Sequence, residues 1–241
     1  MPDIISLNDV SKVYGKVIKT KVLKDVNISF EEGTFNSIIG ASGSGKSTLL
    51  NIMGTLDKPT TGEIYINGVR TDTMKKNELL ELRNKTIGFI FQFHYLLPEF
   101  TVLENVMMPY MIGNSKPSRE ILERANELLE LVGLSKVKNN FANNISGGQQ
   151  ERTAIARALI NNPKIVLSDE PTGNLDSEAT VNIYKLLRGI NEKMKTTFIV
   201  ITHDNRIAEK ADRIVEIKDG KVIGDSFKEK WPSYRCLVLR M

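Results

Sequence analysis

The chain has 241 residues, of which 41% are hydrophobic and 26% are charged, a composition typical of a globular protein that can bury a sizeable core. Its net charge of +4 is not gathered into any long block of lysine and arginine, which argues against a nucleic-acid-binding protein. A single cysteine, Cys236, excludes a disulfide within the chain and fits a reducing compartment.

The N-terminal segment and the apolar runs give no sign of a membrane segment. Residues 1–10 lack the basic start and the apolar stretch of a signal peptide. The longest apolar runs, such as residues 199–201, are far shorter than the roughly 18 residues that cross a bilayer. We therefore expect a soluble, cytoplasmic protein that reaches a membrane only through a partner.

Short runs rich in β-branched and aromatic residues predict strands in the first part of the chain. They mix alternating and continuous apolar patterns, as half-buried and fully buried strands do. The predicted strands are residues 4–10, 22–30, 35–39, 64–67 and 87–91.

Residues 117–133 predict an amphipathic helix. Apolar residues recur at positions 121, 122, 125, 128, 129 and 132, which is one stripe of a helix. Ser118 is placed to cap its N-terminus, Glu120 suits the first turn, and Gly133 is placed to end it.

Strands return after this helical region. Residues 165–168 and 197–202 are short apolar runs of the buried type, each after a helical segment. A strand at 214–217, a turn at 218–221 and a last short strand follow. This alternation predicts a mostly parallel sheet covered by helices.

A glycine-rich phosphate loop lies between a predicted strand and a predicted helix. The sequence G-A-S-G-S-G-K-S-T at 40–48 satisfies the pattern G-x-x-x-x-G-K-[ST]. The glycines let backbone N–H groups face a phosphate chain, and the helix N-terminus adds positive charge. Lys46 would reach the β- and γ-phosphates and Ser47 would bind Mg²⁺. The predicted nucleotide-binding residues here are Gly40, Ala41, Ser42, Gly43, Ser44, Gly45, Lys46, Ser47 and Thr48.

The sequence thus predicts an α/β fold with a P-loop NTPase core. We expect a mostly parallel sheet, an antiparallel β portion on the N-terminal side and an inserted α-helical subdomain. The ATPase domain is predicted at 1–226, with its core at 1–95 and 153–226 and the helical subdomain at about 96–152. Residues 227–241 form a tail with too few apolar residues at any one period to predict its structure.

Two adjacent carboxylates follow the predicted strand at 165–168. In I-V-L-S-D-E, the strand delivers Asp169 and Glu170 to the carboxyl edge of the sheet, where ligands of α/β proteins bind. Asp169 suits Mg²⁺, directly or through water. Glu170 points in another direction and suits the activation of a water molecule as general base.

A second anion-binding segment opens a helix about a hundred residues after the phosphate loop. Residues 144–152 read N-I-S-G-G-Q-Q-E-R, and the helical run T-A-I-A-R-A-L follows. The exposed N–H groups of a helix N-terminus favour a phosphate. Ser146 would also serve as an ordinary N-cap, but capping leaves Gly147 and Gly148 unexplained.

These segments together resemble the ATP-binding subunit of an ABC transporter. Six motifs of that family occur in family order between about residues 4 and 224. They are the Walker A loop at 40–48, the Q-loop glutamine Gln92, the signature I-S-G-G-Q at 145–149, the Walker B strand at 165–170, the D-loop at 173–176 and the switch histidine His203.

The resemblance implies a head-to-tail homodimer with two ATP molecules in its interface. Each ATP would lie on the Walker A loop of one copy and be covered by the signature of the other. If a helical subdomain holds the two segments of one chain apart, one copy cannot close a site, whereas a C2 interface uses each patch twice. The residues that would act on the partner's nucleotide are Ser146, Gly147, Gly148 and Gln149.

Further roles follow from position in the family motifs. Tyr14, in K-V-Y-G, would stack on adenine. Gln92 would contact Mg²⁺ or water and report nucleotide occupancy to a membrane partner. His203 would hold the γ-phosphate and position water, and Asp176 would cross the dimer interface. The implied metal ligands are Ser47, Gln92 and Asp169.

Two positions depart from the family pattern. Ile145 replaces the usual leucine of the signature, which we expect to alter only packing. Glu151 stands where the family often has glutamine. A negative charge near a helix N-terminus is favourable for the helix dipole, and we expect it to be mildly unfavourable for an approaching phosphate.

The segment 92–109 indicates a branch of the family. It is similar to the lipoprotein-release and macrolide-export branch, and so are E-L-R at 81–83 and D-E-P-T-G-N-L-D at 169–176. His94 and the Leu96-Leu97-Pro98 pattern favour lipoprotein release. The resemblance implies a permease partner that holds the protein at the cytoplasmic face of the inner membrane. An apolar patch for the permease is expected from Phe93, Tyr95, Leu96, Leu97 and Phe100.

Two alternative functions remain open at this point. The first is an ATPase that drives efflux of macrolides or antimicrobial peptides. The second, of a different class, is a soluble ABC ATPase that acts on DNA or ribosomes. Such proteins usually carry tandem ATPase modules, a long coiled coil or a zinc insertion, and the sequence shows none of these.

Overall fold

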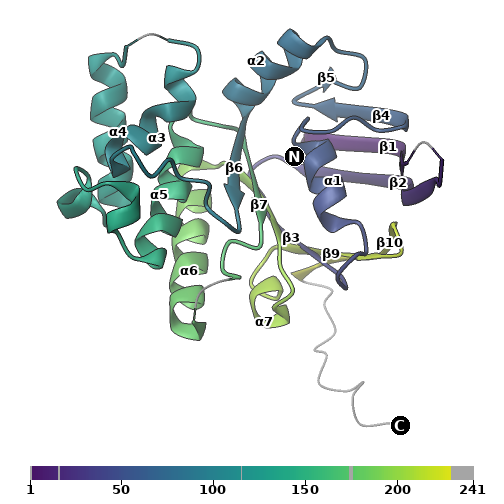
Figure 1. Ribbon diagram of the computed structural model, residues 1–241. Helices are drawn as coiled ribbons and strands as arrows, with labels where there is room; N and C mark the ends of the chain where they lie inside the picture. The colour runs from purple at the N-terminus through teal and green to yellow at the C-terminus, as the bar shows by residue number, and fades with distance from the viewer. Residues whose placement is uncertain (1, 16, 115, 174–175, 229–241) are drawn as a thin grey trace.

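The computed structural model describes residues 2–15, 17–114, 116–173 and 176–228 (Figure 1). It has the α/β architecture that the sequence predicts. A four-stranded antiparallel sheet has the strand order β2-β1-β4-β5, and a six-stranded sheet has the order β10-β9-β3-β8-β7-β6. The strands are β1 (Asp3–Tyr14), β2 (Thr20–Glu31), β3 (Phe35–Ile39), β4 (Thr61–Ile66), β5 (Val69–Arg70), β6 (Ile87–Phe91), β7 (Ile165–Asp169), β8 (Thr197–Ile201), β9 (Arg213–Lys218) and β10 (Lys221–Phe227).

The helices lie on both faces of the six-stranded sheet. Figure 1 shows α3 to α6 on one side of it, and α1 with the antiparallel sheet on the other. The helices are α1 (Lys46–Met53), α2 (Lys76–Thr86), α3 (Val102–Met111), α4 (Arg119–Leu131), α5 (Gly147–Leu159), α6 (Ser177–Met194) and α7 (Asn205–Ala208). Two short 3-10 segments, Ser135–Val137 and Ala142–Asn144, lie between α4 and α5.

The antiparallel sheet follows from the alternating pattern of its strands. In β2, Val26, Ile28 and Phe30 are buried, whereas the residues between them are more exposed. Their side chains therefore share one face of the sheet. They pack with Leu49 and Leu50 of α1 in one apolar core. This core fixes the helix that carries the end of the phosphate loop.

The parallel strands place their carboxyl ends at one edge of the six-stranded sheet. Strand β3 pairs in parallel with β8 and β9, and β7 pairs in parallel with β6 and β8. The phosphate loop follows β3, Glu170 follows β7, and His203 lies two residues after β8. Segments far apart in the sequence thus meet at this edge, as expected for ligand sites of α/β proteins.

The six-stranded sheet separates two apolar cores. Along β8, Phe198 and Val200 face the core that contains α3, α4, α5 and α6. Ile199 and Ile201 of the same strand face the core that contains α1 and the antiparallel sheet. Strands buried on both faces read as continuous apolar runs, which is why the sequence pattern identified them.

The helical region between β6 and β7 begins with α3 and ends with α5. The amphipathic helix predicted within residues 117–133 is confirmed as α4: Ser118 is its N-cap, the Ser118 side chain accepts a hydrogen bond from Ile121 N, and Gly133 has a φ of 74°. Helix α5 continues past residue 152, where we predicted the helical subdomain to end, and packs in the same core as α6. The division into core, subdomain and tail remains a prediction, and most of the tail lies outside the described residues.

Within the described ranges, no helix is both long and apolar enough to cross a bilayer.

Candidate functional site

The phosphate loop joins β3 to α1 and needs glycine at two positions for steric reasons. At Gly40, where φ is 151°, a Cβ atom would lie only 2.1 Å from the carbonyl oxygen of Ile217. Gly45 is the N-cap of α1 with a φ of 106°, a backbone conformation that other residues rarely adopt. The curl of the loop in front of α1 therefore needs glycine at these two positions.

Lys46 lies inside the loop with its ammonium group already oriented. Its Nζ atom donates hydrogen bonds of 2.9 Å to the carbonyl oxygens of Gly40 and Ala41. These bonds use two of the three N–H donors of a lysine ammonium group. The third donor and the positive charge suit an anion held by the loop.

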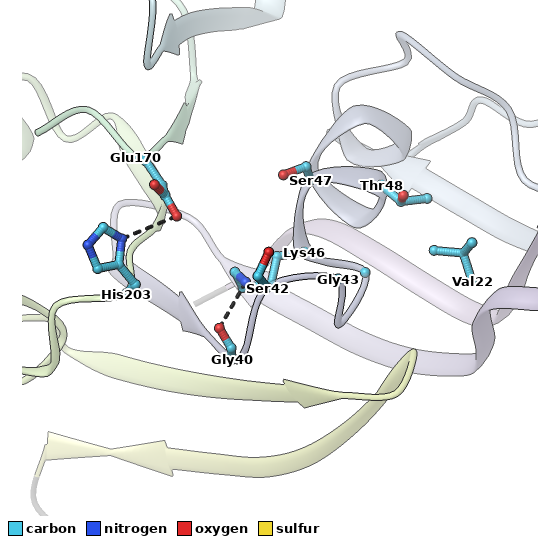
Figure 2. Close-up of a pocket in the computed structure, with 10 residues that line it drawn as sticks. Val22, Gly40, Ser42, Gly43, Lys46, Ser47, Thr48, Glu170 and His203 are labelled. Atoms are coloured by element: carbon cyan, nitrogen blue, oxygen red, sulfur yellow. Dashed lines mark hydrogen bonds and ion pairs between the residues drawn. The ribbon is translucent and has the colours of Figure 1, made fainter. Parts of the chain in front are cut away.

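A cavity of about 530 Å³ opens beside the loop (Figure 2). It collects residues from β2, from the phosphate loop and the start of α1, and from the ends of β7 and β8. The residues that line it are Val22, Gly40, Ser42, Gly43, Gly45, Lys46, Ser47, Thr48, Glu170 and His203. Nine of these were predicted from the sequence. Val22 was not, because no local motif shows that β2 turns this side chain toward the loop.

Ala41 and Ser44 belong to the predicted set but do not line the cavity. Ala41 is exposed, and the Ser44 side chain is buried beneath the loop. Both contribute through the backbone: Ser44 N donates to the carbonyl oxygen of Ala41 at 3.2 Å, and the Ser44 carbonyl accepts a hydrogen bond from Gly220 N. These contacts shape the loop.

The carboxylates at the end of β7, Asp169 in the strand and Glu170 directly after it, lie at the sheet edge that the sequence predicts and point in different directions. Asp169 makes a hydrogen bond with the Ser47 side chain. Burial raises the pKa of Asp169 and the Glu170 charge acts in the same direction, whereas Ser47 and Lys46 oppose the change. Glu170 has a φ of 47°, and its backbone N–H donates to Ile201 O at 3.1 Å. This left-handed conformation turns the Glu170 side chain toward the cavity.

His203 lies directly against Glu170 in the lining of the cavity. Its Nδ1 atom lies 3.3 Å from Glu170 Oε1, and Figure 2 shows the two side chains pointing toward each other. The sequence predicted that the two residues act together on one phosphate and its attacking water. Their contact places both groups at one end of the phosphate loop.

Tyr14 does not line the cavity, but its hydroxyl lies near Thr48 at the end of the phosphate loop. A network that the sequence did not reveal holds the side chain. Its hydroxyl donates to Asp57 Oδ2 at 2.6 Å, and Lys12 Nζ lies 4.8 Å from the ring centroid. Lys12 also donates to Asp57 Oδ1 at 2.6 Å. Burial would raise the pKa of Asp57, but the hydrogen bonds from Lys12 and Tyr14 outweigh it and lower that pKa. Asp57 therefore stays ionised and orients the Tyr14 ring.

Changing Asp57 to alanine should raise the KM for ATP about fivefold and leave kcat unchanged. The Tyr14 ring, which we predict to stack on adenine, would lose an orienting hydrogen bond worth about 1 kcal/mol. Steady-state ATPase assays measure this split. Tyr14→Phe removes the same hydrogen bond and should produce a similar increase, and the double variant should add little to either. An Asp57→Ala enzyme with the parental KM would mean that Asp57 does not position the ring.

Gln92 and Asp176 lie outside the cavity lining. Gln92 follows β6 and packs against the D-loop, since a Cβ on Gly173 would lie 2.7 Å from Gln92 Nε2. Asp176 is the N-cap of α6, and its Oδ1 atom accepts a hydrogen bond from Ala179 N at 2.8 Å. Residues 174 and 175 of the D-loop lie outside the described residues.

The signature residues form an exposed helix N-terminus. Ser146 caps α5 in a capping box: its N–H donates to Gln149 Oε1 at 2.9 Å, and Gln149 N donates to Ser146 Oγ. A Cβ atom built on Gly147 or Gly148 would meet nothing within 4 Å. The four predicted residues lie together here, but none of them lines the cavity of their own chain.

The two departures from the family pattern have different surroundings. Ile145 packs in the apolar core of the helical region. Glu151 is fully buried, and burial raises its pKa to about 8. Our expectation that Glu151 presents a negative charge to an approaching phosphate was therefore wrong, because the side chain points into the protein and its burial favours the protonated form.

The segment after Gln92 exposes apolar side chains. Phe93 and Tyr95 are about two thirds exposed, at 66% and 63%. Leu97 and Phe100 are also exposed, whereas Leu96 is partly buried. We call the four exposed residues the 93–100 patch.

Comparison with known proteins gives consistent matches. The sequence model of the ABC transporter family matches residues 23–173, more than half of the chain. The lipoprotein-releasing system ATP-binding protein LolD 1 of Rhodopseudomonas palustris is 47% identical over 226 residues, which cover 93% of this chain and 100% of that protein. LolD of Anaeromyxobacter dehalogenans is 46% identical over 223 residues, which cover 92% and 93% of the two chains.

Solved structures with the same architecture also match. The ATP-binding cassette MJ0796, in a dimeric post-hydrolysis state bound to ADP and Pi, superposes with a TM-score of 0.86 at 43% identity, covering 94% of this chain and 100% of that one. CbiO1 from Clostridium perfringens, part of the transporter complex CbiONQ, superposes with a TM-score of 0.84 at 28% identity, covering 95% and 90%.

Proposed function

Because this chain belongs to the ABC transporter family, we propose that two copies of it enclose two Mg-ATP molecules head to tail and drive a membrane permease in lipoprotein release. The chain is an ATP-hydrolysing subunit of an ABC transporter, as its sequence indicated. The relatives from two organisms are named for lipoprotein release, which supports this substrate class over efflux of macrolides.

One observation carries the dimer proposal: the cavity contains only half of a nucleotide site. The phosphate loop, Glu170 and His203 line it, whereas the exposed N-terminus of α5 lies elsewhere on the same chain. The open pair of glycines at this helix N-terminus is suited to bind a phosphate. A nucleotide on the phosphate loop of the same chain does not place its phosphate there. A second copy related by a C2 axis supplies the missing half to each site.

The residues in and beside the cavity suit the phosphate chain and the base of ATP. Backbone N–H groups of the phosphate loop and the Lys46 ammonium group hold the β- and γ-phosphates. Val22 offers an apolar contact beside Thr48, and the oriented Tyr14 ring offers a stacking face for adenine. Ser146, Gly147, Gly148 and Gln149 of the second copy then cover the γ-phosphate.

The residues around Ser47 also fit Mg²⁺. Magnesium is commonly held by one or two carboxylates together with substrate phosphates, rather than by a cage of protein ligands. Asp169 and Ser47 form an oxygen pair of this kind, and in the described part of the chain no cluster of three metal-binding side chains occurs. Ser47, Asp169 and Gln92 would hold the ion. When bound, Mg²⁺ would supply positive charge that offsets the negative charge developing on the phosphates.

Hydrolysis follows from the groups at the end of β7 and β8. Glu170 accepts the proton of a water molecule that attacks the γ-phosphate, and His203 contacts the γ-phosphate and keeps that water in line. Asp176 of the D-loop faces the second copy, and Gln92 contacts the ion or the water. Because the 93–100 patch follows Gln92 directly, movement of the Q-loop reaches the surface that we assign to the permease.

We assign the 93–100 patch to a coupling helix of the permease. An exposed group of large apolar side chains indicates an interaction surface, and an amphipathic helix can lay its apolar face on such a group. This contact would hold the ATPase at the cytoplasmic face of the inner membrane. We expect no nucleic acid partner.

Changing Phe93 to aspartate should weaken permease binding about 30-fold, since the loss of a central apolar anchor typically costs about 2 kcal/mol. The tagged chain is isolated with its membrane partners and reconstituted in liposomes with a lipidated protein. ATP-dependent release of that protein to the soluble fraction is then measured. Release should depend on ATP and fall sharply with Phe93→Asp.

The matched control is Leu80→Asp, which changes an exposed apolar side chain of α2 outside the patch and should leave release unchanged. ATP-dependent export of a macrolide without lipoprotein release would favour the efflux alternative. Recovery of ribosomes or DNA with no integral membrane protein would contradict the transporter proposal altogether.

A further inference from the structure

A partly buried cluster of ionisable side chains joins the Q-loop to the signature helix. His94 lies in the turn after β6, and Glu151 and Arg157 lie on α5. The His94 Nδ1 atom is 3.1 Å from Glu151 Oε2. Glu151 is fully buried, and the Arg157 charge interacts with it in the opposite direction to burial. None of these groups belongs to the cavity lining.

The turn in front of α5 has an unusual backbone. His94 and Tyr95 have φ values of 58° and 48°, a left-handed conformation that non-glycine residues keep only when their surroundings hold it. Arg157 supplies that support: one of its terminal nitrogens donates to Tyr95 O at 2.7 Å, and the other donates to the carbonyl oxygen of His94. A side chain of α5 thus fixes the shape of the turn.

Glu151 is placed to hold the side-chain end of the same turn. Neither of its carboxyl oxygens makes a hydrogen bond, and the His94 Nδ1 atom that lies 3.1 Å from Oε2 makes none either. One Glu151 oxygen approaches the imidazole to 3.1 Å, so the side chain reaches the ring from the first turns of α5. A side chain of this length with a hydrogen-bonding end is therefore what this position needs.

The cluster has a functional element on each side. Gln92 lies two residues before His94 in the sequence. Phe93 and Tyr95 of the 93–100 patch are the direct sequence neighbours of His94. On the other side, the backbone of Gly147, one of the glycines at the exposed N-terminus of α5, lies within reach of the His94 ring. One imidazole ring therefore contacts both Glu151 and the segment that we assign to the partner's nucleotide.

We propose that Glu151 is a positioning residue that, with His94 and Arg157, fixes the Q-loop turn to the first turns of α5 and so sets where the signature meets the nucleotide of the second copy. This inference rests on the proposed function, because it requires the signature to act across a dimer. Through this cluster, the Q-loop and the signature move as one unit.

The test compares Glu151→Leu with the conservative Glu151→Gln variant. The leucine keeps the volume but removes the polar group, so kcat for ATP should fall about tenfold. The KM for ATP should stay the same, because the nucleotide binds to the intact phosphate loop. Glutamine keeps the length and the hydrogen-bonding end of Glu151, so it should restore most of the activity. Glu130→Leu, at an exposed position of α4, is the matched control and should behave as the wild type.

His94→Leu provides a second route to the same contact. It should reduce kcat by a similar factor, and the His94→Leu/Glu151→Leu double variant should lose little more than either single variant, because both break one contact. A normal kcat in either single leucine variant would overturn the positioning role. So would a double variant whose fold loss in kcat equals the product of the two single losses. If Glu151→Leu does not fold, the His94→Leu and Glu151→Gln variants are measured instead. A normal kcat in His94→Leu, or a tenfold loss of kcat in Glu151→Gln, would reject the positioning role.

Dimer formation with Mg-ATP separates this inference from the proposed function. Each variant is placed in a chain that also carries Glu170→Gln, and the dimer is measured by analytical ultracentrifugation. Glu151→Leu should weaken the dimer about tenfold. If the parent chain never dimerises, the proposed function itself fails. If the parent dimerises and Glu151→Leu dimerises equally well, only the positioning role fails.

Discussion

Replacing Glu170 with glutamine should slow ATP hydrolysis by about 100-fold or more, since a positioned general base contributes at least this factor. The amide occupies the same volume and keeps the turn after β7, but it cannot accept the proton of the attacking water. ATP should bind with unchanged affinity, because the phosphate loop and Lys46 are intact. Turnover is measured by phosphate release, and affinity by equilibrium binding of a fluorescent ATP analogue.

The same substitution should convert a transient dimer into a stable one. With the γ-phosphate retained, each ATP keeps its contacts with both copies, so the pair should elute as a dimer in Mg-ATP and as a monomer in Mg-ADP. Glu178→Gln, at an exposed glutamate in the first turn of α6, is the matched control and should leave turnover unaltered. Normal hydrolysis by Glu170→Gln would remove Glu170 from the role of general base.

Two inactive variants should restore hydrolysis when they are mixed. Lys46→Ala should weaken ATP binding roughly 100-fold, because it removes a charge-assisted contact worth about 1.5–3 kcal/mol. Ser146→Arg should leave ATP binding to the monomer intact and block closure of the dimer, because it places a long cation at the open end of α5. Alone, each variant should show almost no turnover.

Mixing works because a head-to-tail dimer shares its parts between copies. In a mixed pair, one site combines the intact phosphate loop of the Ser146→Arg chain with the intact signature of the Lys46→Ala chain. With random pairing, activity should reach roughly a quarter of the wild-type value, since half of the dimers are mixed and each has one complete site of two. Single-turnover hydrolysis at limiting ATP is the measurement.

The control uses a chain that carries both substitutions, mixed with the wild-type chain. Each site of that mixed pair contains one damaged half, so the mixed dimers should be inactive and only wild-type pairs should contribute. If the signature acted on the nucleotide of its own chain, the first mixture would show no recovery and the second would keep the full activity of its wild-type component.

The sequence was sufficient for the elements whose pattern is local. Strands β3, β7 and β8 are buried on both faces, so they read as continuous apolar runs with little ambiguity. The helix α2 was missed because only Leu79 of its residues is buried, which leaves no apolar stripe to detect. Strand β5 is only two residues long, too short for any periodic signal.

The residues of the candidate site likewise fall into those that a local sequence pattern predicts and those that only the tertiary structure reveals. The phosphate loop and the carboxylates after β7 are contiguous in sequence, so their composition was enough to predict them. Asp57 reaches Tyr14 across 43 positions of the chain, and Val22 reaches the loop from β2. The burial of Glu151 depends on the turn at His94, far from it in sequence. Such contacts are set by tertiary packing, which a pattern of neighbouring residues does not contain.

The double-sided burial of β7 and β8 also determines how the protein loses its structure. Val166 faces one core, whereas Ile165 and Leu167 on either side of it face the other. Displacing either strand therefore exposes apolar surface on both sides at once. If one core unfolds, the strands that the other core packs against are lost as well. Damage to the core around α3 to α6 should therefore also lower the thermal stability of the half that binds ATP, even where the two halves share no side-chain contact.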